Sequence, residues 1–260
     1  MKHADITHYA ISSPKLTAPI TLALVTDLHE TSYGPRQKNL LSAIRRRNPD
    51  LILLGGDLFD PSVRKKGAAC LIRQLAASFP CFFVSGNHEE WTRRMSALNL
   101  GLARLGVCVL RGEVKTIRVK GQLLQVGGVA DPHAFVRSHH SLCLSQKWIN
   151  QLARCKSRLS PEYFAILLSH RPELGDYYAG SGFDLIACGH AHGGQIRLPF
   201  CPGGLLAPHQ GLFPKYAGGM YHLGAASMIV SRGLCQNRLP RFGNPPELVF
   251  IRLRPGGTSY

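Results

Sequence analysis

Acidic residues are scarce in this 260-residue chain, which has 15 Asp and Glu against 31 Lys and Arg and a formal net charge of +16. Aromatic residues make up only 8%. No basic run is interleaved with them, which argues against a stacking platform for nucleic-acid bases. The basic excess still predicts an anionic partner: nucleic acid, an anionic membrane surface or a phosphate-bearing substrate.

Long apolar runs are also missing. The longest stretches without Asp, Glu, Lys or Arg cover 198–214 and 216–231, and prolines or glycines interrupt both, so neither fits a spanning helix of about 20 apolar residues. The first 15 residues lack the apolar region of a secretory signal. The eight cysteines form no CxxC pair, which favours reduced thiols. We therefore expect a cytoplasmic protein, with peripheral contact at an anionic membrane surface among the options that its charge allows.

The remaining composition is that of a globular protein. Apolar residues make up 45% of the chain and charged residues 18%, a balance that excludes intrinsic disorder. The length is enough to bury a sizeable core. No internal repeat and no long polar linker divides the sequence, so we expect a single domain over residues 1–260, of the α/β class and with two packed sheets.

Short apolar runs and amphipathic stretches alternate along the first hundred residues. This pattern predicts strands at 20–26, 51–54 and 81–85, and helices at 36–47, 64–78 and 89–105. Further on it predicts one helix at 146–158 and strands at 114–119, 123–130, 164–169, 184–188, 221–223, 228–230 and 247–253. Parallel strands joined by crossovers place their carboxyl ends at one edge of the sheet, where ligands bind.

Polar residues follow five of these strands directly. Seven of them are nitrogen or oxygen donors: Asp27, His29, Asp57, Asn87, His170, His190 and His192. A set without thiolate suits Mn²⁺, Fe or Zn²⁺, and it is too large for one ion with an open position. Two ions would share one bridging carboxylate. Asp57 is the candidate bridge because it lies in the middle of the series.

The same residues carry a family resemblance. Asp27-x-His29, Gly56-Asp57-x-x-Asp60, Gly86-Asn87-His88-Glu89, His170 and Gly189-His190-x-His192 resemble the five ordered motifs of the calcineurin-like metallophosphoesterases. The GGQIRLP run at 193–199, with 210–216 and 231–234, is similar to a bacterial phosphodiesterase-like branch, several members of which act at or near membranes. The resemblance implies a four-layer α/β/β/α sandwich, in which helices flank two mixed β-sheets.

The resemblance also implies roles for individual residues. The first metal would be held by Asp27, His29, Asp57 and His192, and the second by Asp57, Asn87, His170 and His190. Two divalent cations are implied, Mn²⁺ before Fe or Zn²⁺, and a solvent molecule between them would attack phosphorus in line. His88 would face the leaving group as general acid or charge stabiliser, and Asp60 would orient it.

One position departs from the family pattern. Protein Ser/Thr phosphatases of this superfamily carry a phosphate-binding Arg directly after the second Asp of the GDxxD motif, where this chain has Pro61. Phosphoprotein hydrolysis is therefore disfavoured, and Arg232 or Arg197 are the alternative anion contacts.

The proline-rich segment 198–214 either packs on the domain or lines a groove for the apolar part of a substrate, and its His209 could reach the site.

These observations favour a phosphohydrolase that cleaves a phosphodiester or pyrophosphate bond in a small phosphate ester, either nucleotide-type or lipid-linked. A metal-dependent nuclease is the alternative enzyme that the +16 charge suggests. A non-catalytic scaffold on the same fold is the alternative from another class, disfavoured because every expected ligand is present. No obligate protein partner is evident from the sequence.

Overall fold

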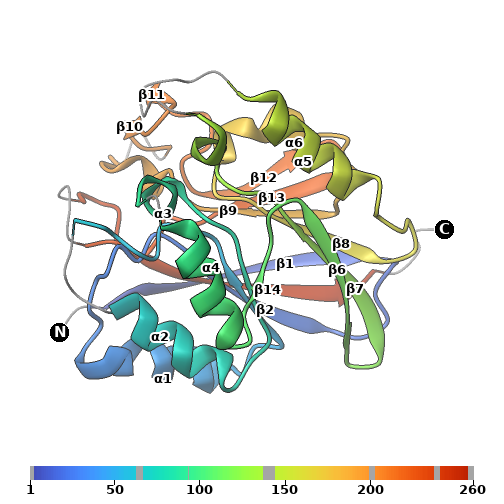
Figure 1. Cartoon of the computed structure of the whole chain (residues 1–260), viewed down its shortest axis with the longest axis horizontal. Coiled ribbons are helices and arrows are strands. Elements are labelled where there is room, and N and C mark those ends of the chain that lie inside the picture. The colour runs from blue at the N-terminus through green and yellow to red at the C-terminus, as the bar shows by residue number, and fades with distance from the viewer. Residues whose placement is uncertain are drawn as a thin grey trace.

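Two six-stranded mixed sheets form the centre of the computed structural model (Figure 1), which describes residues 3–62, 67–92, 94–136, 144–198, 203–236 and 241–256. The first sheet has the spatial order β1 (Asp5–Ser13), β14 (Glu247–Pro255), β2 (Ile20–Val25), β3 (Leu51–Leu54), β4 (Cys81–Phe83) and β5 (Cys108–Val109). The second has the order β12 (Gly219–Leu223), β13 (Ala226–Val230), β9 (Leu185–Cys188), β8 (Phe164–Leu168), β7 (Gln122–Gly128) and β6 (Glu113–Val119).

Helices cover the outer face of each sheet. On the first sheet lie α1 (Lys38–Arg47), α2 (Gly67–Ala76) and α4 (Met95–Arg104); on the second lie α5 (Gln146–Lys156) and the short α6 (Gly175–Tyr178) (Figure 1). Between the sheets, apolar residues of both inner faces form one core cluster, and each sheet packs a second cluster against its helices. The predicted four-layer α/β/β/α sandwich is therefore confirmed.

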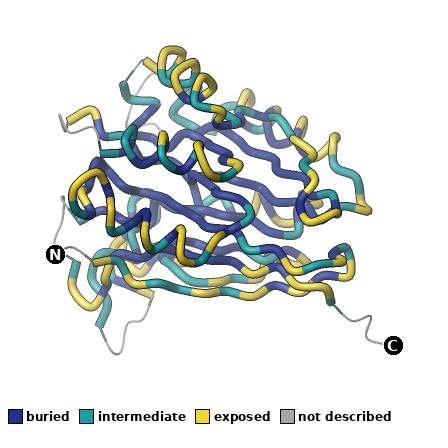
Figure 2. The backbone as a smooth tube through the Cα atoms, turned by 90° about the horizontal axis from the view of Figure 1, so that it is seen from below, coloured by how far each residue is buried: buried dark blue, intermediate teal, exposed yellow. Residues whose placement is uncertain are grey.

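The central strands are apolar on both faces because both faces are covered. All four residues of β3 and all five of β8 are buried. Figure 2 shows buried backbone, in dark blue, running through the middle of the molecule. Helix α1 buries Leu40, Leu41 and Ile44, whereas Arg45 and Arg46 are exposed on its outer side. Each layer thus follows from the apolar pattern of its segment.

One predicted helix differs from the structure, and one strand was not predicted. The expected helix 89–105 is two helices, α3 (Asn87–Trp91) and α4, with a break between them. Strand β1 lies at the edge of its sheet and only Ile11 and Ser13 are fully buried in it, which explains why its polar sequence gave no strand signal. Residues 64–66 of the expected helix 64–78, with their basic cluster, lie outside the described residues, as do Arg93 and residues 199–202 of the 198–214 segment.

The carboxyl ends of the parallel strands of both sheets lie at the same end of the molecule. Strands β2, β3, β4 and β5 run parallel in the first sheet, and β7, β8 and β9 run parallel in the second. The backbone N–H of His190, after β9, donates to the Asp27 carboxylate, after β2, at 3.0 Å. The carboxyl ends of the two parallel sets therefore meet.

Within the described ranges, no helix combines the length and apolar character needed to cross a membrane.

Candidate metal centre

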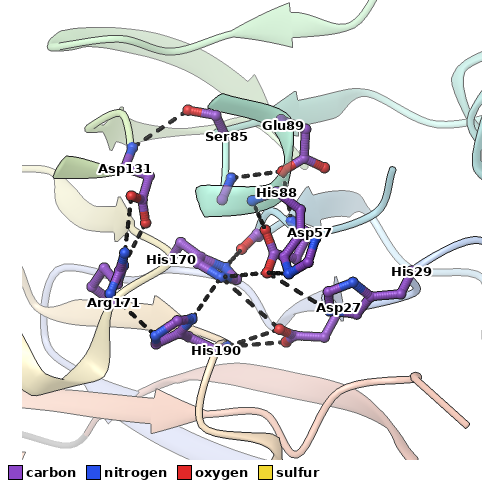
Figure 3. Close-up of polar contacts among 12 residues, drawn as sticks. Asp27, His29, Asp57, Ser85, His88, Glu89, Asp131, His170, Arg171 and His190 are labelled. Carbon is purple, nitrogen blue, oxygen red and sulfur yellow. Dashed lines mark hydrogen bonds and ion pairs between the residues drawn. The ribbon is translucent and has the colours of Figure 1, made fainter. Parts of the chain in front are cut away.

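The loops that follow five strands bring all nine predicted site residues to one place. Figure 3 labels six of them: Asp27, His29, Asp57, His88, His170 and His190. Strand β2 leads to Asp27 and His29, and β3 to Asp57 and Asp60. The remaining five follow β4, β8 and β9: Asn87, His88, His170, His190 and His192. Eight of the nine are buried, with at most 6% of their surface exposed, and His192 is intermediate. So many buried polar side chains in one place need partners that compensate their desolvation.

One group of donors surrounds Asp27. Ligand atoms of Asp27, His29 and His192 all lie within 4.8 Å of one another. The distance from His192 Nε2 to Asp27 Oδ1 is 3.8 Å, longer than a direct hydrogen bond. The three side chains therefore face a common point from two different sheets, as a cation with nitrogen and oxygen ligands requires.

A second group surrounds His170. Ligand atoms of Asp57, His170 and His190 also lie within 4.8 Å of one another. His170 Nε2 is 3.3 Å from Asp57 Oδ2 and 3.1 Å from His190 Nδ1. The Oδ1 of Asn87 is buried and accepts no hydrogen bond from the described residues. An orphaned buried carbonyl oxygen is unfavourable unless a cation or water satisfies it.

Asp57 belongs to both neighbourhoods. Its Oδ2 lies 3.7 Å from His29 Nε2 and 3.3 Å from His170 Nε2, while its Oδ1 accepts the backbone N–H of His88 at 2.8 Å. Burial opposes ionisation, but His170 and His29 outweigh it and hold the pKa of Asp57 well below its usual range. The side chain is thus a fixed carboxylate between two sets of imidazoles, the geometry that a bridging ligand needs.

Two of the candidate histidine ligands, His190 and His192, favour the neutral form that binds metal. Burial and the Arg171 guanidinium hold the pKa of His190 well below its usual value, and burial with His29 does the same for His192. The Nδ1–H of His170 has the carbonyl of Gly55 as its acceptor at 2.8 Å, which leaves Nε2 facing Asp57. An outer hydrogen bond of this kind fixes the tautomer of a metal ligand. Burial opposes protonation of His170, but the Asp57 carboxylate outweighs it and raises the pKa of His170 to about 10, so a cation bound between them would displace the Nε2 proton. The residues present therefore fit a pair of divalent cations.

Backbone strain is concentrated at the same residues. Five of the seven predicted ligands have positive φ angles: Asp27 (49°), His29 (42°), Asp57 (51°), His190 (68°) and His192 (48°). This left-handed conformation costs about 1–2 kcal/mol for a residue with a side chain. Such strain persists only where the surrounding structure imposes it, and it gathers at functional sites.

Glycines and Glu89 hold two of these loops together. A β-carbon on Gly86 would collide with the Asp57 carboxylate, and one on Gly56 (φ +89°) would lie 2.9 Å from His170 Nδ1. The fully buried carboxylate of Glu89 accepts, at 2.8–3.0 Å, the backbone N–H groups of four residues of the loops after β3 and β4: Asp57, Leu58, Phe59 and Gly86. Burial and the Asp57 carboxylate raise the pKa of Glu89 to about 7. Glu89 thus fixes the backbone on both sides of the centre.

Glu89→Ala is expected to destabilise the protein strongly, because it leaves four buried N–H groups without an acceptor. Such groups cost about 1–3 kcal/mol each when unpaired, less what water recovers, so we expect a loss of at least about 3 kcal/mol in the free energy of unfolding. Urea denaturation measures it. The matched control is Glu162→Ala, since Glu162 is exposed. Equal midpoints for the two variants would contradict this role of Glu89.

His88 and Asp60 lie on the cavity side of Asp57. His88 Nε2 is 4.0 Å from Asp57 Oδ2, and its Nδ1 is 3.8 Å from Asp60 Oδ1. The ring also packs against Trp91, with centroids 4.3 Å apart. Asp60 lies between two imidazoles, since its Oδ2 is 3.5 Å from His29 Nδ1. The predicted pairing of His88 with Asp60 is therefore present as proximity, at a distance longer than a hydrogen bond.

A cavity of about 410 Å³ opens over the centre and is lined by His29, Asp57, Asn87, His88, Trp91, His190, His192, Gln195, Pro208, His209, Cys235 and Arg241. Neither suggested anion contact is among these residues. Arg232 is ion-paired with Glu247 at 2.8 Å, and Arg197 donates to the carbonyl of Gly193. Arg241 is the arginine in the lining, with Nη2 3.3 Å from His192 Nδ1. The position of Arg241 after a long loop gives no signal in the sequence.

Two buried residues behind His190 were not predicted. Arg171 directs its guanidinium at Asp131, whose carboxylate accepts from both Nε and Nη2, and the pair is visible in Figure 3. Burial opposes ionisation of Asp131, but Arg171 outweighs it and holds the pKa of this carboxyl far below its usual range. Asp131 follows the predicted strand 123–130 directly, so the strand-end rule that found the other site residues could have found it too.

The sequence of this chain is similar to those of bacterial proteins named as phosphoesterases. A relative from Bacillus subtilis (strain 168), the uncharacterized metallophosphoesterase YkuE, is 30% identical over 88% of this chain and 77% of its own. The phosphodiesterase YaeI of Escherichia coli (strain K12) is 27% identical over 91% of this chain and 83% of its own.

Solved structures share the fold at low identity. The phosphopantetheinyl hydrolase PptH of Mycobacterium tuberculosis superposes with a TM-score of 0.54 at 14% identity, covering 84% of this chain and 92% of that one. A dimetal phosphatase from Danio rerio gives 0.52 at 15% identity, with coverages of 83% and 88%. The family model for calcineurin-like phosphoesterases matches residues 20–194, the stretch that contains every predicted ligand. The chain belongs to the calcineurin-like phosphoesterase family.

Proposed function

We propose that this chain is a dinuclear metal-dependent phosphohydrolase that cleaves phosphodiester or pyrophosphate bonds. The observation that carries the proposal is the position of the Asp57 carboxylate, 3.7 Å from His29 Nε2 on one side and 3.3 Å from His170 Nε2 on the other. A carboxylate that lies between two sets of nitrogen and oxygen donors is the arrangement that divides seven ligands between two cations.

The donor set assigns ligands to each cation. Asp27, His29, Asp57 and His192 would hold the first, and Asp57, Asn87, His170 and His190 the second. Nitrogen and oxygen donors without thiolate favour Mn²⁺. Fe or Zn²⁺ are the alternatives, and the concentration of each metal in the cell decides which one is bound. Two such ions would supply Lewis acidity toward the phosphoryl group and activate water.

The chain's own residues would provide binding and proton transfer. His88 lines the cavity beside Asp57 and would protonate the leaving oxygen or stabilise its charge, with Asp60 orienting the ring. Arg241 is the cation at the cavity wall and would contact a phosphate oxygen. Pro61 stands where protein phosphatases of the family have their phosphate-binding Arg, so the proposal favours diesters and anhydrides over phosphoproteins. The relative named as a phosphodiesterase supports this choice.

The charge distribution supports an anionic substrate. Seven of the 15 acidic residues are at most 5% exposed: Asp27, Glu30, Asp57, Asp60, Glu89, Asp131 and Glu247. Among the described Lys and Arg residues, Arg171 alone is buried. The exterior is therefore more basic than the net charge indicates, and it favours approach of phosphate groups or of the anionic surface that presents them.

An exposed apolar hairpin supports a lipid-linked substrate. Strands β10 (Leu206–Ala207) and β11 (Gly211–Leu212) form a two-stranded sheet at the site end of the molecule (Figure 1), and their turn contributes Pro208 and His209 to the cavity lining. Leu212 is 64% exposed and Phe213 is 69% exposed. Phe213 also has a φ of 53°, a rare conformation for a bulky residue. We propose that these side chains contact the acyl part of the substrate at an anionic membrane surface.

A substrate panel tests the proposal. After treatment with a chelator, we expect no cleavage of bis(p-nitrophenyl) phosphate, and addition of Mn²⁺ should restore it. The panel adds a phosphomonoester, a nucleotide-sugar pyrophosphate, a phospholipid and a polynucleotide. Mn²⁺-dependent cleavage of the polynucleotide alone would instead support the nuclease alternative.

Two hairpin variants test the lipid-linked part. Leu212→Ser and Phe213→Asn are each expected to lower kcat/KM for the lipid substrate about tenfold, because burial of such a side chain contributes about 1.5–3 kcal/mol. Cleavage of the small soluble diester serves as the control and should not change. Equal losses on both substrates would count against lipid contact.

A further inference from the structure

His209 occupies a turn position that histidine rarely adopts. Pro208 and His209 are the central residues of the turn between β10 and β11, closed by the hydrogen bond from Gln210 N to Ala207 O at 3.2 Å. The φ angle of His209 is 60°. A turn led by proline with positive φ at the next residue favours Gly or Asn there, because other side chains cost about 1–2 kcal/mol in this conformation. A histidine at this cost indicates a role for its ring.

The ring of His209 reaches the centre from outside. Its Nδ1 lies 2.9 Å from His190 Nε2 and 2.7 Å from Arg171 Nη1. The other nitrogen of His190, Nδ1, faces His170 on the metal side at 3.1 Å. His209 thus contacts the nitrogen of His190 that points away from the proposed cation.

Counting hydrogens fixes the direction of these bonds. Arg171 Nη1 carries two hydrogens and no lone pair. It faces Glu173 Oε1 at 3.0 Å, His209 Nδ1 at 2.7 Å and His190 Nε2 at 3.1 Å, and the two nearest of these atoms are its acceptors. His209 Nδ1 therefore carries a lone pair. The Nε2–H of His190, 2.9 Å away, can share this lone pair in a three-centre hydrogen bond, and that tautomer leaves the Nδ1 lone pair of His190 for a cation.

The same atoms also resemble a further cation site. Glu173, His190 and His209 offer ligand atoms within 4.8 Å of one another. Arg171 Nη1, however, is 3.0 Å from Glu173 Oε1, 3.1 Å from His190 Nε2 and 2.7 Å from His209 Nδ1. The guanidinium already provides the positive charge at this point, so a metal ion there would be repelled.

We infer that His209 is a positioning residue for His190: it accepts the Nε2–H of His190 and so selects the tautomer whose Nδ1 binds the second cation. Without it, Arg171 Nη1, 3.1 Å away, would donate to His190 Nε2. The proton would then move to Nδ1 and block the metal side. The inference rests on the proposed dinuclear centre. It assigns a function to His209, whereas Leu212 and Phe213 further along this segment are exposed.

Two variants separate this role from turn stability. Glycine adopts positive φ without cost, so His209→Gly removes the ring while keeping or improving the turn. In His209→Asn, the Oδ1 atom takes the place of Nδ1 as an acceptor, and Asn also tolerates the left-handed conformation. Mn²⁺ binding to the full chain, measured by isothermal titration calorimetry after chelator treatment, compares both with the wild type and with His190→Ala.

Wild-type protein is expected to bind two Mn²⁺ ions. His209→Gly should bind one of them about 10–100-fold more weakly, the usual effect of removing an outer partner of a metal ligand. His190→Ala should weaken the same ion, and His209→Asn should bind both ions within about threefold of wild type. Two unchanged sites in His209→Gly, or no rescue by His209→Asn, would overturn the inference and leave the dinuclear centre intact. Failure of the wild type to bind two ions would overturn the proposed function itself, and this inference with it.

Discussion

Asp57→Asn is expected to reduce Mn²⁺-dependent hydrolysis of bis(p-nitrophenyl) phosphate below detection. The substitution keeps the shape of the side chain but removes the negative charge that lies between the two groups of imidazoles. Both of the proposed cations would lose a ligand at once. Loss of an outer partner alone costs about 10–100-fold, so loss of a shared inner ligand should exceed the upper end of that range. Steady-state rates over a series of Mn²⁺ concentrations measure the effect.

Asp176→Asn is the matched control for this prediction. The Asp176 side chain is 86% exposed and pairs only with Lys215, at 3.6 Å, among the ion pairs of the described residues, so its loss should leave the rate unchanged. Calorimetric Mn²⁺ titration of Asp57→Asn should show weakening at both sites. A variant that retained two tight sites and normal turnover would exclude Asp57 as the bridge, and with it the proposed division of ligands.

The arrangement of the site could be predicted because it follows from local signals. Each predicted ligand comes directly after a short apolar strand, and parallel strands bring their carboxyl ends together. The structure places Asp27, Asp57 and His170 in contact although they are far apart in the chain. The order of strands across the sheets was not needed for this prediction. The roles of these residues as metal ligands stay a prediction that the experiments above test.

Residues that act through tertiary contacts could not be predicted in the same way. Arg171 reaches Asp131 and His209, which lie 40 and 38 positions away in the chain. Its function depends on how loops of the second sheet pack together. Arg232, one of the two suggested anion contacts, is absent from the cavity lining for a similar reason, because the sequence does not show that Glu247 pairs with it. The distance of an arginine from a motif along the chain does not show which atoms its guanidinium contacts, because the long side chain can reach several loops.

The break between α3 and α4 has a local cause that the apolar pattern does not reveal. Helix α3 begins at Asn87, directly after Gly86, because Glu89 in its first turn accepts the Gly86 N–H and caps the helix. It ends at Trp91, whose ring packs on His88. The segment is shaped by the contacts of Glu89 and His88 at the candidate metal centre, whereas α4 follows the ordinary packing of an amphipathic helix. These contacts override helical periodicity at this point.

His88→Ala is expected to lower the rate by about 10²–10⁴-fold, the usual contribution of a general acid, while both cations stay bound. The ring lines the cavity, and its Nε2 is 4.0 Å from Asp57 Oδ2. It lies outside the two donor sets, so its removal should cost proton transfer and not metal. Calorimetric Mn²⁺ titration and steady-state kinetics measure the two quantities separately. His222→Ala, at an exposed histidine, is the control and should change neither.

The leaving group decides which chemistry His88 supplies. A general acid matters most when the leaving oxygen is strongly basic, because the proton then removes the largest developing charge. We therefore expect His88→Ala to lose more rate on an alkyl ester, whose leaving group is basic, than on the p-nitrophenyl ester. Equal losses on both esters would instead assign His88 to stabilising charge on the phosphoryl oxygens. Loss of a bound Mn²⁺ ion in His88→Ala would contradict both roles and make His88 a metal ligand. Its donor atoms lie within 4.8 Å of those of His29 and Asp57, so the Mn²⁺ titration tests this outcome directly.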